Sequence, residues 1–336
     1  MDDLIVLAQP LVPEALSRVQ QAAPGARVEV IDPFPPDASV PDALARATVL
    51  FADAVWSDAH RLVDLDWIQL GSHGYRQLAG LPMAGTCVTN ASGVNDIPIA
   101  EWCVMMMLAL HRDLPGMQRA QAEHRWDRSP VFQAELAGHR VGIFGYGNIG
   151  REVAQVCGAL GLQVSVLSRR GTEPRGLRWS PRGEVPAPIP DRVFAPDQLH
   201  EFLSDLDFLV LAAPDTASTR GTFDAAALAH LPRHAFLLNP ARAGLVDEEA
   251  LRVALQTGAL AGAALDDHYR QPMPADDPFF DLPNTMITAH ISGSAQSPHF
   301  LSRNWDLFCE NLRRRTSGEP LFNVIDPDDL DLGPRS

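Results

Sequence analysis

The sequence predicts an α/β protein with two Rossmann-like, doubly wound parallel-sheet domains and an active-site cleft between them. Three observations support this fold class. Short apolar strands alternate with helical segments in both halves of the chain. A glycine-rich turn at residues 145–150 lies between a strand and a helix. The length of 336 residues, with 46% hydrophobic and 21% charged residues, suits two soluble globular domains with sizeable cores.

The first half of the chain predicts one sheet and a long helix. Apolar runs predict strands at residues 4–7, 27–31, 47–51 and 67–70, with a helix at 13–22. A longer apolar helix is expected at residues 99–111, in a position where it can connect the two domains. Because this segment is apolar nearly all round, we expect the helix to be buried.

The second half repeats the alternation. We predict strands at residues 141–144, 163–167, 208–212, 235–238, 261–265 and 286–288, with helices at 151–160 and 298–315. Residues 169–190 are rich in proline, glycine and arginine, and we interpret them as a long, mobile surface loop without chemistry. The elements predict a substrate domain of residues 1–97 and 292–336, and a dinucleotide-binding domain of residues 98–291.

Charge and composition exclude several classes of function. The net charge of −15 argues against a nucleic-acid-binding protein, which needs a basic face. The longest apolar run, residues 99–110, is too short to span a membrane, and the N-terminus is acidic where a secretory signal is basic. The four cysteines form no C-x-x-C pair, so we expect no metal site and a reducing compartment, the cytoplasm.

The glycine-rich turn predicts a dinucleotide site. Its sequence is Gly145-Tyr146-Gly147-Asn148-Ile149-Gly150. In a G-x-G-x-x-G turn the first glycine makes the tight turn, the second lets the backbone approach a pyrophosphate, and the third lets helix and strand pack closely. Three glycines at this spacing can also serve packing alone, but the position between a strand and a helix favours cofactor binding.

The end of the next strand indicates which cofactor is preferred. An enzyme that uses NAD carries an acidic residue here, on the ribose 2′-hydroxyl. This chain has Ser168-Arg169-Arg170 instead. A hydroxyl and two guanidinium groups suit a 2′-phosphate, so NADP(H) is favoured and NAD(H) is possible. The alternative is a pair of solvated arginines in the loop.

Three later segments resemble the D-2-hydroxyacid dehydrogenase family. Residues 239–247, N-P-A-R-A-G-L-V-D, resemble the family signature N-x-A-R-G-x-x-V-D. Residues 264–274, A-L-D-D-H-Y-R-Q-P-M-P, resemble its A-x-D-V…E-P-L-P segment, and residues 288–293, T-A-H-I-S-G, resemble T-P-H-I-x-G. Their order and spacing also match. The resemblance implies a hydride transfer between a nicotinamide and a small 2-keto or 2-hydroxy acid, such as glyoxylate or hydroxypyruvate.

Two residues of these segments have the chemistry that this reaction needs. Arg242 can hold a keto acid by paired hydrogen bonds to its carboxylate. His290 can donate a proton to the developing alkoxide and take it back in the reverse direction. Taken without their motifs, the first would be interpreted as a surface arginine and the second as a structural histidine.

The chain departs from the family pattern at Gln271. The family has a glutamate here as the partner of the histidine, and an amide can orient the ring but adds no charge. We therefore expect Gln271 to withhold the charge of the family glutamate, and His290 to lose its proton at lower pH than in a relative with the glutamate. A glutamine–histidine pair is also typical of formate dehydrogenases, a branch of the same superfamily. Lesser departures are Ala243 for glycine and Ala289 for proline.

The resemblance implies further contacts and an assembly. Substrate contacts are expected at Ser72, His73, Gly74 and Asn95, and further cofactor contacts at Pro214, Ala241, Asp266 and Gly293. The family is commonly dimeric, so we expect a homodimer to which the helix at 99–111 can contribute. Two other functions stay open, namely a formate-dehydrogenase-like oxidoreductase and a non-catalytic dinucleotide-sensing or interaction protein.

Overall fold

The computed structural model describes residues 3–33, 38–78, 85–173, 176–183 and 189–326. These residues form two compact units. The first unit contains residues 3–95 with the gaps above, together with 176–183 and 295–326, and the second contains 96–173 and 189–294. The chain therefore leaves the first unit after residue 95, returns to it at residues 176–183, and returns again from residue 295.

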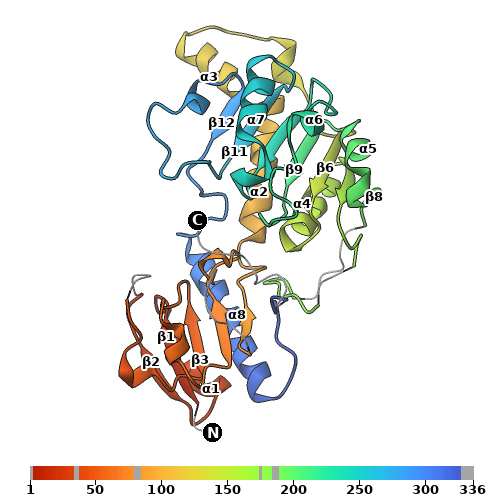
Figure 1. Cartoon of the computed structure of the whole chain (residues 1–336). Coiled ribbons are helices and arrows are strands. Elements are labelled where there is room, and N and C mark those ends of the chain that lie inside the picture. The colour runs from red at the N-terminus through yellow and green to blue at the C-terminus, as the bar shows by residue number, and fades with distance from the viewer. Residues whose placement is uncertain (1–2, 34–37, 79–84, 174–175, 184–188, 327–336) are drawn as a thin grey trace. The chain divides into compact units, whose positions relative to one another are not determined.

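A five-stranded parallel sheet forms the centre of the first unit (Figure 1). Its strands, in spatial order, are β2 (Arg27–Val30), β1 (Leu4–Ala8), β3 (Val49–Ala52), β4 (Trp67–Leu70) and β5 (Cys87–Thr89). Four of them confirm predicted strands. The sequence analysis missed β5, which has three residues.

Two helices cover one face of this sheet, α1 (Ala15–Ala22) and α8 (Pro298–Thr316). The Phe308 ring of α8 stacks on Phe51 of β3 with centroids 4.4 Å apart. The opposite face packs against short 3₁₀ turns and loops that include the buried Trp56. The C-terminal helix thus completes the core of the first unit.

A seven-stranded parallel sheet forms the second unit. Its spatial order is β12 (Thr285–Ile287), β11 (Gly262–Leu265), β10 (Phe236–Asn239), β9 (Phe208–Leu211), β6 (Arg140–Phe144), β7 (Gln163–Leu167) and β8 (Arg192–Phe194). The six predicted strands of this half are confirmed, and β8 was not predicted. The strand order reverses between β6 and β9, and at such a switch point parallel sheets bind ligands beyond the carboxyl ends of their strands.

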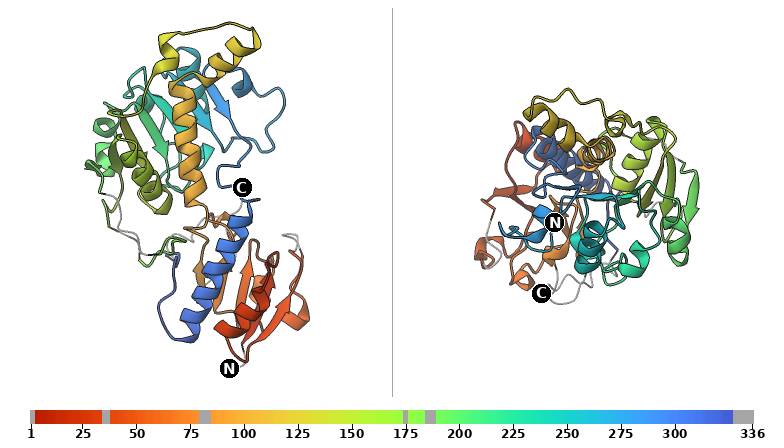
Figure 2. Two further views of the ribbon diagram at one scale, coloured as in Figure 1. Left: turned by 180° about the vertical axis from the view of Figure 1, so that it is seen from behind. Right: turned by 90° about the horizontal axis from the view of Figure 1, so that it is seen from above.

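Helices lie on both faces of the second sheet. Figure 2 shows α2 (Asp96–His111) and α4 (Asn148–Ala159) on one face, where their apolar residues form one core with the sheet. The other face packs against α5 (Leu199–Leu203), α6 (Ala225–Leu228) and α7 (Glu248–Gln256). The remaining helix of the described chain, α3 (Leu114–Ala122), follows α2 directly. Both units are therefore α/β folds of the expected class.

The expectation that the helix after residue 98 is buried all round is wrong. Met105 and Leu108 of α2 are 51% and 41% exposed, and Glu101 is exposed beside them. The opposite side of α2, with Cys103 and Met107, is fully buried. Apolar composition could not distinguish these two sides. Among the described residues, no helix combines the length and the hydropathy needed to cross a membrane.

The interpretation of residues 169–190 as a mobile loop also needs correction. Residues 176–183 belong to the first unit, where Trp179 packs against Val94 and Leu307. The Trp179 N–H donates to Asn323 Oδ1 at 3.2 Å, and Asn323 N–H donates to the Leu177 carbonyl at 2.9 Å. One aromatic side chain and two hydrogen bonds anchor this segment, a pattern that composition alone does not reveal.

Candidate active site

The predicted residues of the second unit follow the strands of its parallel sheet at one edge. The glycine turn follows β6, Ser168 follows β7, Arg242 follows β10, and His290 follows β12. Because all pairings in this sheet are parallel, these carboxyl ends share one edge. The sheet therefore collects segments that are far apart in the sequence.

The glycine turn has the backbone that its motif requires. Gly145 has a φ of +100°, a conformation that favours glycine, and its N–H donates to the Leu167 carbonyl at 2.9 Å. A Cβ at Gly150 would stand 2.2 Å from the Gly145 carbonyl oxygen. A Cβ at Gly147 would meet no heavy atom within 4 Å. Packing thus explains the first and third glycines but not the second.

The open space at Gly147 fits a bound pyrophosphate. This residue precedes α4, whose first N–H groups lack partners within the helix and carry the positive end of the helix dipole. A glycine there leaves the backbone accessible to an anion. Tyr146 of the motif lies in the turn and is buried, whereas Asn148 and Ile149 begin α4.

The segment expected to meet a 2′-phosphate lies at the end of β7. Ser168 is half-buried and accepts a hydrogen bond from the Arg170 N–H at 3.4 Å. Arg169 and Arg170 are exposed, and within the described part of the chain neither guanidinium forms an ion pair. Both guanidinium groups are therefore available to an anionic ligand.

Arg151 is a residue of this region that sequence reasoning missed. It lies on α4, is 7% exposed, and has its guanidinium 4.3 Å from the centroid of the Tyr146 ring. Its Nη2 donates to the Thr172 carbonyl at 2.6 Å. Burial lowers the pKa of Arg151. The side chain ties the glycine turn to the segment that follows Arg170, and its place directly after Gly150 was the available signal.

Arg242 lies in a tight turn after β10. The Asn239 side chain closes this turn by accepting from the Ala241 N–H at 3.1 Å and donating to the Arg242 carbonyl at 2.8 Å. The half-buried Arg242 donates through Nη1 to the Ala241 carbonyl at 2.6 Å. The remaining donors of this guanidinium can bind a carboxylate.

Asp266 shapes the loop that carries His290. Its fully buried carboxylate accepts from Thr288 Oγ1 at 2.6 Å and from the backbone N–H groups of Ile291 and Ser292 at 2.8 and 2.9 Å. The His290 N–H donates to the Asp266 carbonyl at 2.8 Å, and His290 has a φ of +56°. The described contacts of Asp266 are thus internal, and its expected contact with a cofactor stays a prediction.

The side chain of His290 faces both Gln271 and a carboxylate. Its Nδ1 lies 3.3 Å from Gln271 Oε1 and 3.3 Å from Asp267 Oδ1. The Gln271 contact agrees with a role in orienting the ring. Gln271 adds no charge, but the Asp267 carboxylate, which the sequence analysis did not single out, lies at the same ring nitrogen. The signal was in the sequence, where Asp267 occupies the valine position of the A-x-D-V motif.

Apart from Arg242, the residues expected to bind substrate lie in the first unit, where Ser72, His73 and Gly74 form a hydrogen-bonded loop after β4. Ser72 Oγ donates to the Gly74 carbonyl at 3.0 Å, and Asn90 Nδ2 donates to the His73 carbonyl at 2.8 Å. Asn95 directly precedes α2, and its buried Oδ1 accepts no hydrogen bond in the described structure. The contacts of these residues with a substrate stay predictions.

The other expected cofactor contacts lie at the same edge as the glycine turn. Pro214 follows β9 and is exposed, whereas Ala241 and Gly293 follow β10 and β12 and are half-buried. Among the described residues, no group of three or more histidine, cysteine or acidic side chains is arranged to hold a metal ion.

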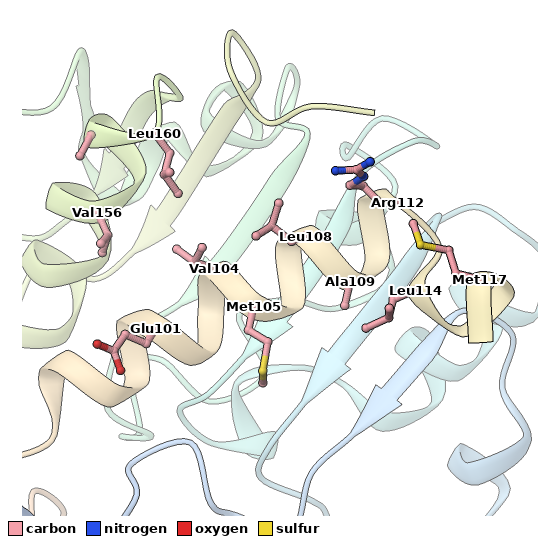
Figure 3. Close-up of a pocket in the computed structure, with 11 residues that line it drawn as sticks. Glu101, Val104, Met105, Leu108, Ala109, Arg112, Leu114, Met117, Val156 and Leu160 are labelled. Atoms are coloured by element: carbon pink, nitrogen blue, oxygen red, sulfur yellow. The ribbon is translucent and has the colours of Figure 1, made fainter. Parts of the chain in front are cut away.

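An apolar depression lies on α2, away from these strand ends (Figure 3). Figure 3 shows Met105, Leu108 and Leu114 lining it from α2 and α3, and Val156 and Leu160 lining it from α4 and its C-terminal end. Its polar groups are those of Glu101, on α2, and of Arg112, directly after the end of α2. None of the residues expected to bind cofactor or substrate lines this depression.

Comparisons with known proteins agree with the geometry of the second unit. The family model described as D-isomer specific 2-hydroxyacid dehydrogenase, NAD binding domain, matches residues 104–292. A D-3-phosphoglycerate dehydrogenase of Archaeoglobus fulgidus is 29% identical over 245 residues, which are 72% of this chain and 43% of that protein. The chain thus spans less than half the length of this relative.

Two further relatives are closer to this chain in length. A putative 2-hydroxyacid dehydrogenase of Haemophilus influenzae is 30% identical over 223 residues, which are 63% of this chain and 65% of that protein. The solved structure of a D-isomer specific 2-hydroxyacid dehydrogenase from Xanthobacter autotrophicus Py2 covers 98% of this chain and 100% of its own, with 27% identity and a TM-score of 0.80.

The family model covers more than half of the chain, and its match includes the glycine turn, the Arg242 turn and His290. The chain therefore belongs to the D-isomer specific 2-hydroxyacid dehydrogenase family.

Proposed function

We propose that this protein is an NADP(H)-dependent oxidoreductase that transfers a hydride between nicotinamide and a small 2-keto or 2-hydroxy acid. The observation that supports this most is the shared strand edge of the second sheet, which carries the glycine turn, Arg242 and His290. In this proposal the second unit binds the cofactor. We also propose that the loop around Ser72 binds substrate.

The chemistry follows from the side chains. NADPH bound at the glycine turn would supply the hydride that C2 of a keto acid gains. The His290 ring would give its Nε2 proton to the carbonyl oxygen, so that hydride and proton together convert the keto acid to a 2-hydroxy acid. Arg242 binds the substrate carboxylate, which fixes the carbonyl for attack.

The cofactor preference rests on Arg169 and Arg170. Both guanidinium groups lack an acidic partner among the described residues and follow β7, where an NAD enzyme of this fold has a carboxylate. The solved relative from Xanthobacter autotrophicus contains NADPH, which supports the proposal by analogy at 27% identity. NAD(H) remains the second cofactor.

Three further proposals concern the substrate, the compartment and the assembly. We propose glyoxylate or hydroxypyruvate as substrate, the cytoplasm as location and a homodimer as assembly. The exposed apolar residues Met105 and Leu108 on α2 support the last of these, since such a surface favours a protein contact.

A formate-dehydrogenase-like reaction is the second candidate. Gln271 beside His290 favours it. Formate oxidation needs no proton at an alkoxide, so it gives no role to the carboxylate of Asp267 at the same ring. A non-catalytic dinucleotide sensor would need neither residue.

A panel of substrates tests the proposal. The absorbance of NADPH should fall with at least one small 2-keto acid, and the absorbance with NADP⁺ or NAD⁺ should not rise with formate. Reduction of the cofactor by formate alone would favour the second candidate. NADPH binding without turnover of any 2-keto acid would favour the sensor.

A further inference from the structure

Asp267 joins three parts of the candidate site. It follows β11 and is 9% exposed. Its Oδ2 accepts from the Ala243 N–H, next to Arg242, at 2.7 Å. Its Oδ1 accepts from Gln271 Nε2 at 2.5 Å and lies 3.3 Å from His290 Nδ1. A single carboxylate thus contacts the arginine turn, the amide and the imidazole.

These contacts determine how the amide and the ring are oriented. A carboxylate only accepts hydrogen bonds, so Gln271 turns its NH₂ group toward Asp267 and its Oε1 toward the ring. His290 Nδ1 then faces two acceptors and must carry a proton. Nε2 is therefore the nitrogen that gains and loses a proton.

We propose that Asp267 is the charged partner that orients His290 and stabilises its protonated form. The charge that the family motif places at the residue before P-L-P is here provided by Asp267, four residues earlier in the chain. Asp267 acts as a positioning residue, and its importance for turnover rests on the proposed role of His290 as proton donor.

The other charged groups near this ring have different partners. Asp266 accepts three hydrogen bonds from the His290 loop, and His268 Nε2 contacts the Thr288 carbonyl. Arg270 pairs with Glu248 and Asp277, and Arg242 donates to a backbone carbonyl. Among the described residues, Asp267 is the acidic side chain within ion-pair distance of His290.

The contact between Asp267 and Gln271 determines the expected effect of Gln271→Glu. The introduced carboxylate would replace an NH₂ group that lies 2.5 Å from Asp267 Oδ1, so two like charges would meet. The single change therefore cannot simply add charge to the ring. With Asp267→Asn in the same chain, the repulsion disappears and one carboxylate again faces His290.

Two measurements on the full chain test the proposal. The first follows the titration midpoint of the His290 ring by NMR of histidine-labelled protein, with His290→Gln to assign the signal. The second follows kcat/KM against pH for reduction of a 2-keto acid by NADPH. The variants are Asp267→Asn, Gln271→Glu and the double variant. Asp276→Asn, which removes an exposed carboxylate from the same loop, is the matched control.

We expect Asp267→Asn to shift the titration midpoint of His290, and the double variant to restore it. Asp267→Asn should lower the His290 midpoint, since a carboxylate 3.3 Å from the ring favours its charged form. Reduction needs the protonated ring, so the falling limb of kcat/KM should move to lower pH by the same amount. The double variant should restore both values, and Asp276→Asn should change neither.

Two outcomes would overturn the proposal. One is an unchanged midpoint in Asp267→Asn with a wild-type circular dichroism spectrum. The other is a double variant that folds without recovering the midpoint, which would leave Asp267 a structural role. If Asp267→Asn fails to fold, the His290 midpoint of the double variant decides: a wild-type value supports the proposal, and a lower value overturns it. If the wild type reduces no 2-keto acid, the proposed function fails while the NMR midpoints still test the pairing.

Discussion

Asp267 Oδ1 lies 3.3 Å from Nδ1 of His290, and the other oxygen of the same carboxylate accepts the N–H of Ala243. One buried side chain therefore fixes the turn that carries Arg242 and faces the ring proposed to donate a proton. Arg242 and His290 are the two groups proposed to act on the substrate. Asp267 is proposed to position both without contacting the substrate itself.

Gly147 and Gly150 should separate cofactor binding from folding. Gly147→Ala adds a methyl group to open space at a φ of −78°, so the protein should fold normally but bind NADPH about tenfold more weakly. Gly150→Ala forces the backbone apart at Gly145 and should cost about 1–3 kcal/mol of stability. Thermal unfolding and NADPH titration of both variants measure the two effects. Tight NADPH binding by Gly147→Ala would contradict the assignment of this turn.

Arg169 should select for the 2′-phosphate. Arg169→Ala removes one charge-assisted hydrogen bond to the 2′-phosphate. The binding free energy of NADPH should therefore weaken by roughly 1.5–3 kcal/mol, and that of NADH should stay nearly unchanged. Fluorescence titration with both cofactors makes the comparison, and Arg128→Ala, which removes an exposed arginine elsewhere, is the control. A wild-type protein that prefers NADH by about tenfold or more would refute the NADP(H) preference.

The proposed role of Arg242 depends on the paired hydrogen-bond donors of its guanidinium group and not only on its charge. Arg242→Lys keeps the positive charge but cannot form paired bonds to a carboxylate, so kcat/KM for a 2-keto acid should fall by about tenfold to a hundredfold. Steady-state kinetics measure the loss, and NADPH affinity should stay the same. Near wild-type turnover in this variant would place Arg242 outside the substrate site.

Asp3 should make the stability of the first unit depend on pH. Hydrogen bonds from Arg315, at 2.8 and 3.1 Å, hold the pKa of the Asp3 carboxyl below its ordinary value of 3.8. A lowered pKa adds stability above that value, and the contribution is lost as pH falls through the lowered pKa. Both side chains are partly exposed, so Asp3→Asn should cost about 1 kcal/mol near pH 7.

Urea unfolding at several pH values measures this effect. The difference between wild type and Asp3→Asn should shrink toward zero as pH falls below 3.8 and through the lowered pKa of Asp3. Asp32→Asn, at an exposed carboxyl outside any ion pair in the described structure, is the control. A difference that stays constant from neutral to acid pH would show that Asp3 does not contribute through its charge.

The sequence predicted the frame of the fold because its strands are short, apolar and regularly separated. The class of both units and ten strands were foreseen from that pattern. The strands β5 and β8, of three residues each, were missed, although β12 has the same length and was foreseen. The exposed side of α2 was missed because Met105 and Leu108 are as apolar as their buried neighbours.

The site was predicted where a motif fixes a residue type and missed where contact depends on the loop. Arg242 and His290 stand in segments with a family pattern. The approach of Asp267 to His290 depends on the backbone after β11 and on the positive φ of His290. The anchoring of Trp179 depends on Asn323, 144 residues away. No local pattern encodes either distance.

The most direct test is a single turnover of enzyme-bound NADPH with a 2-keto acid, in the wild type and in His290→Gln. We expect the wild type to oxidise NADPH and form the 2-hydroxy acid, and the variant to bind NADPH equally well but to react about 10²–10⁴-fold more slowly. A variant that reacts at the wild-type rate, or a wild type that binds NADPH and reduces no 2-keto acid, would contradict this expectation.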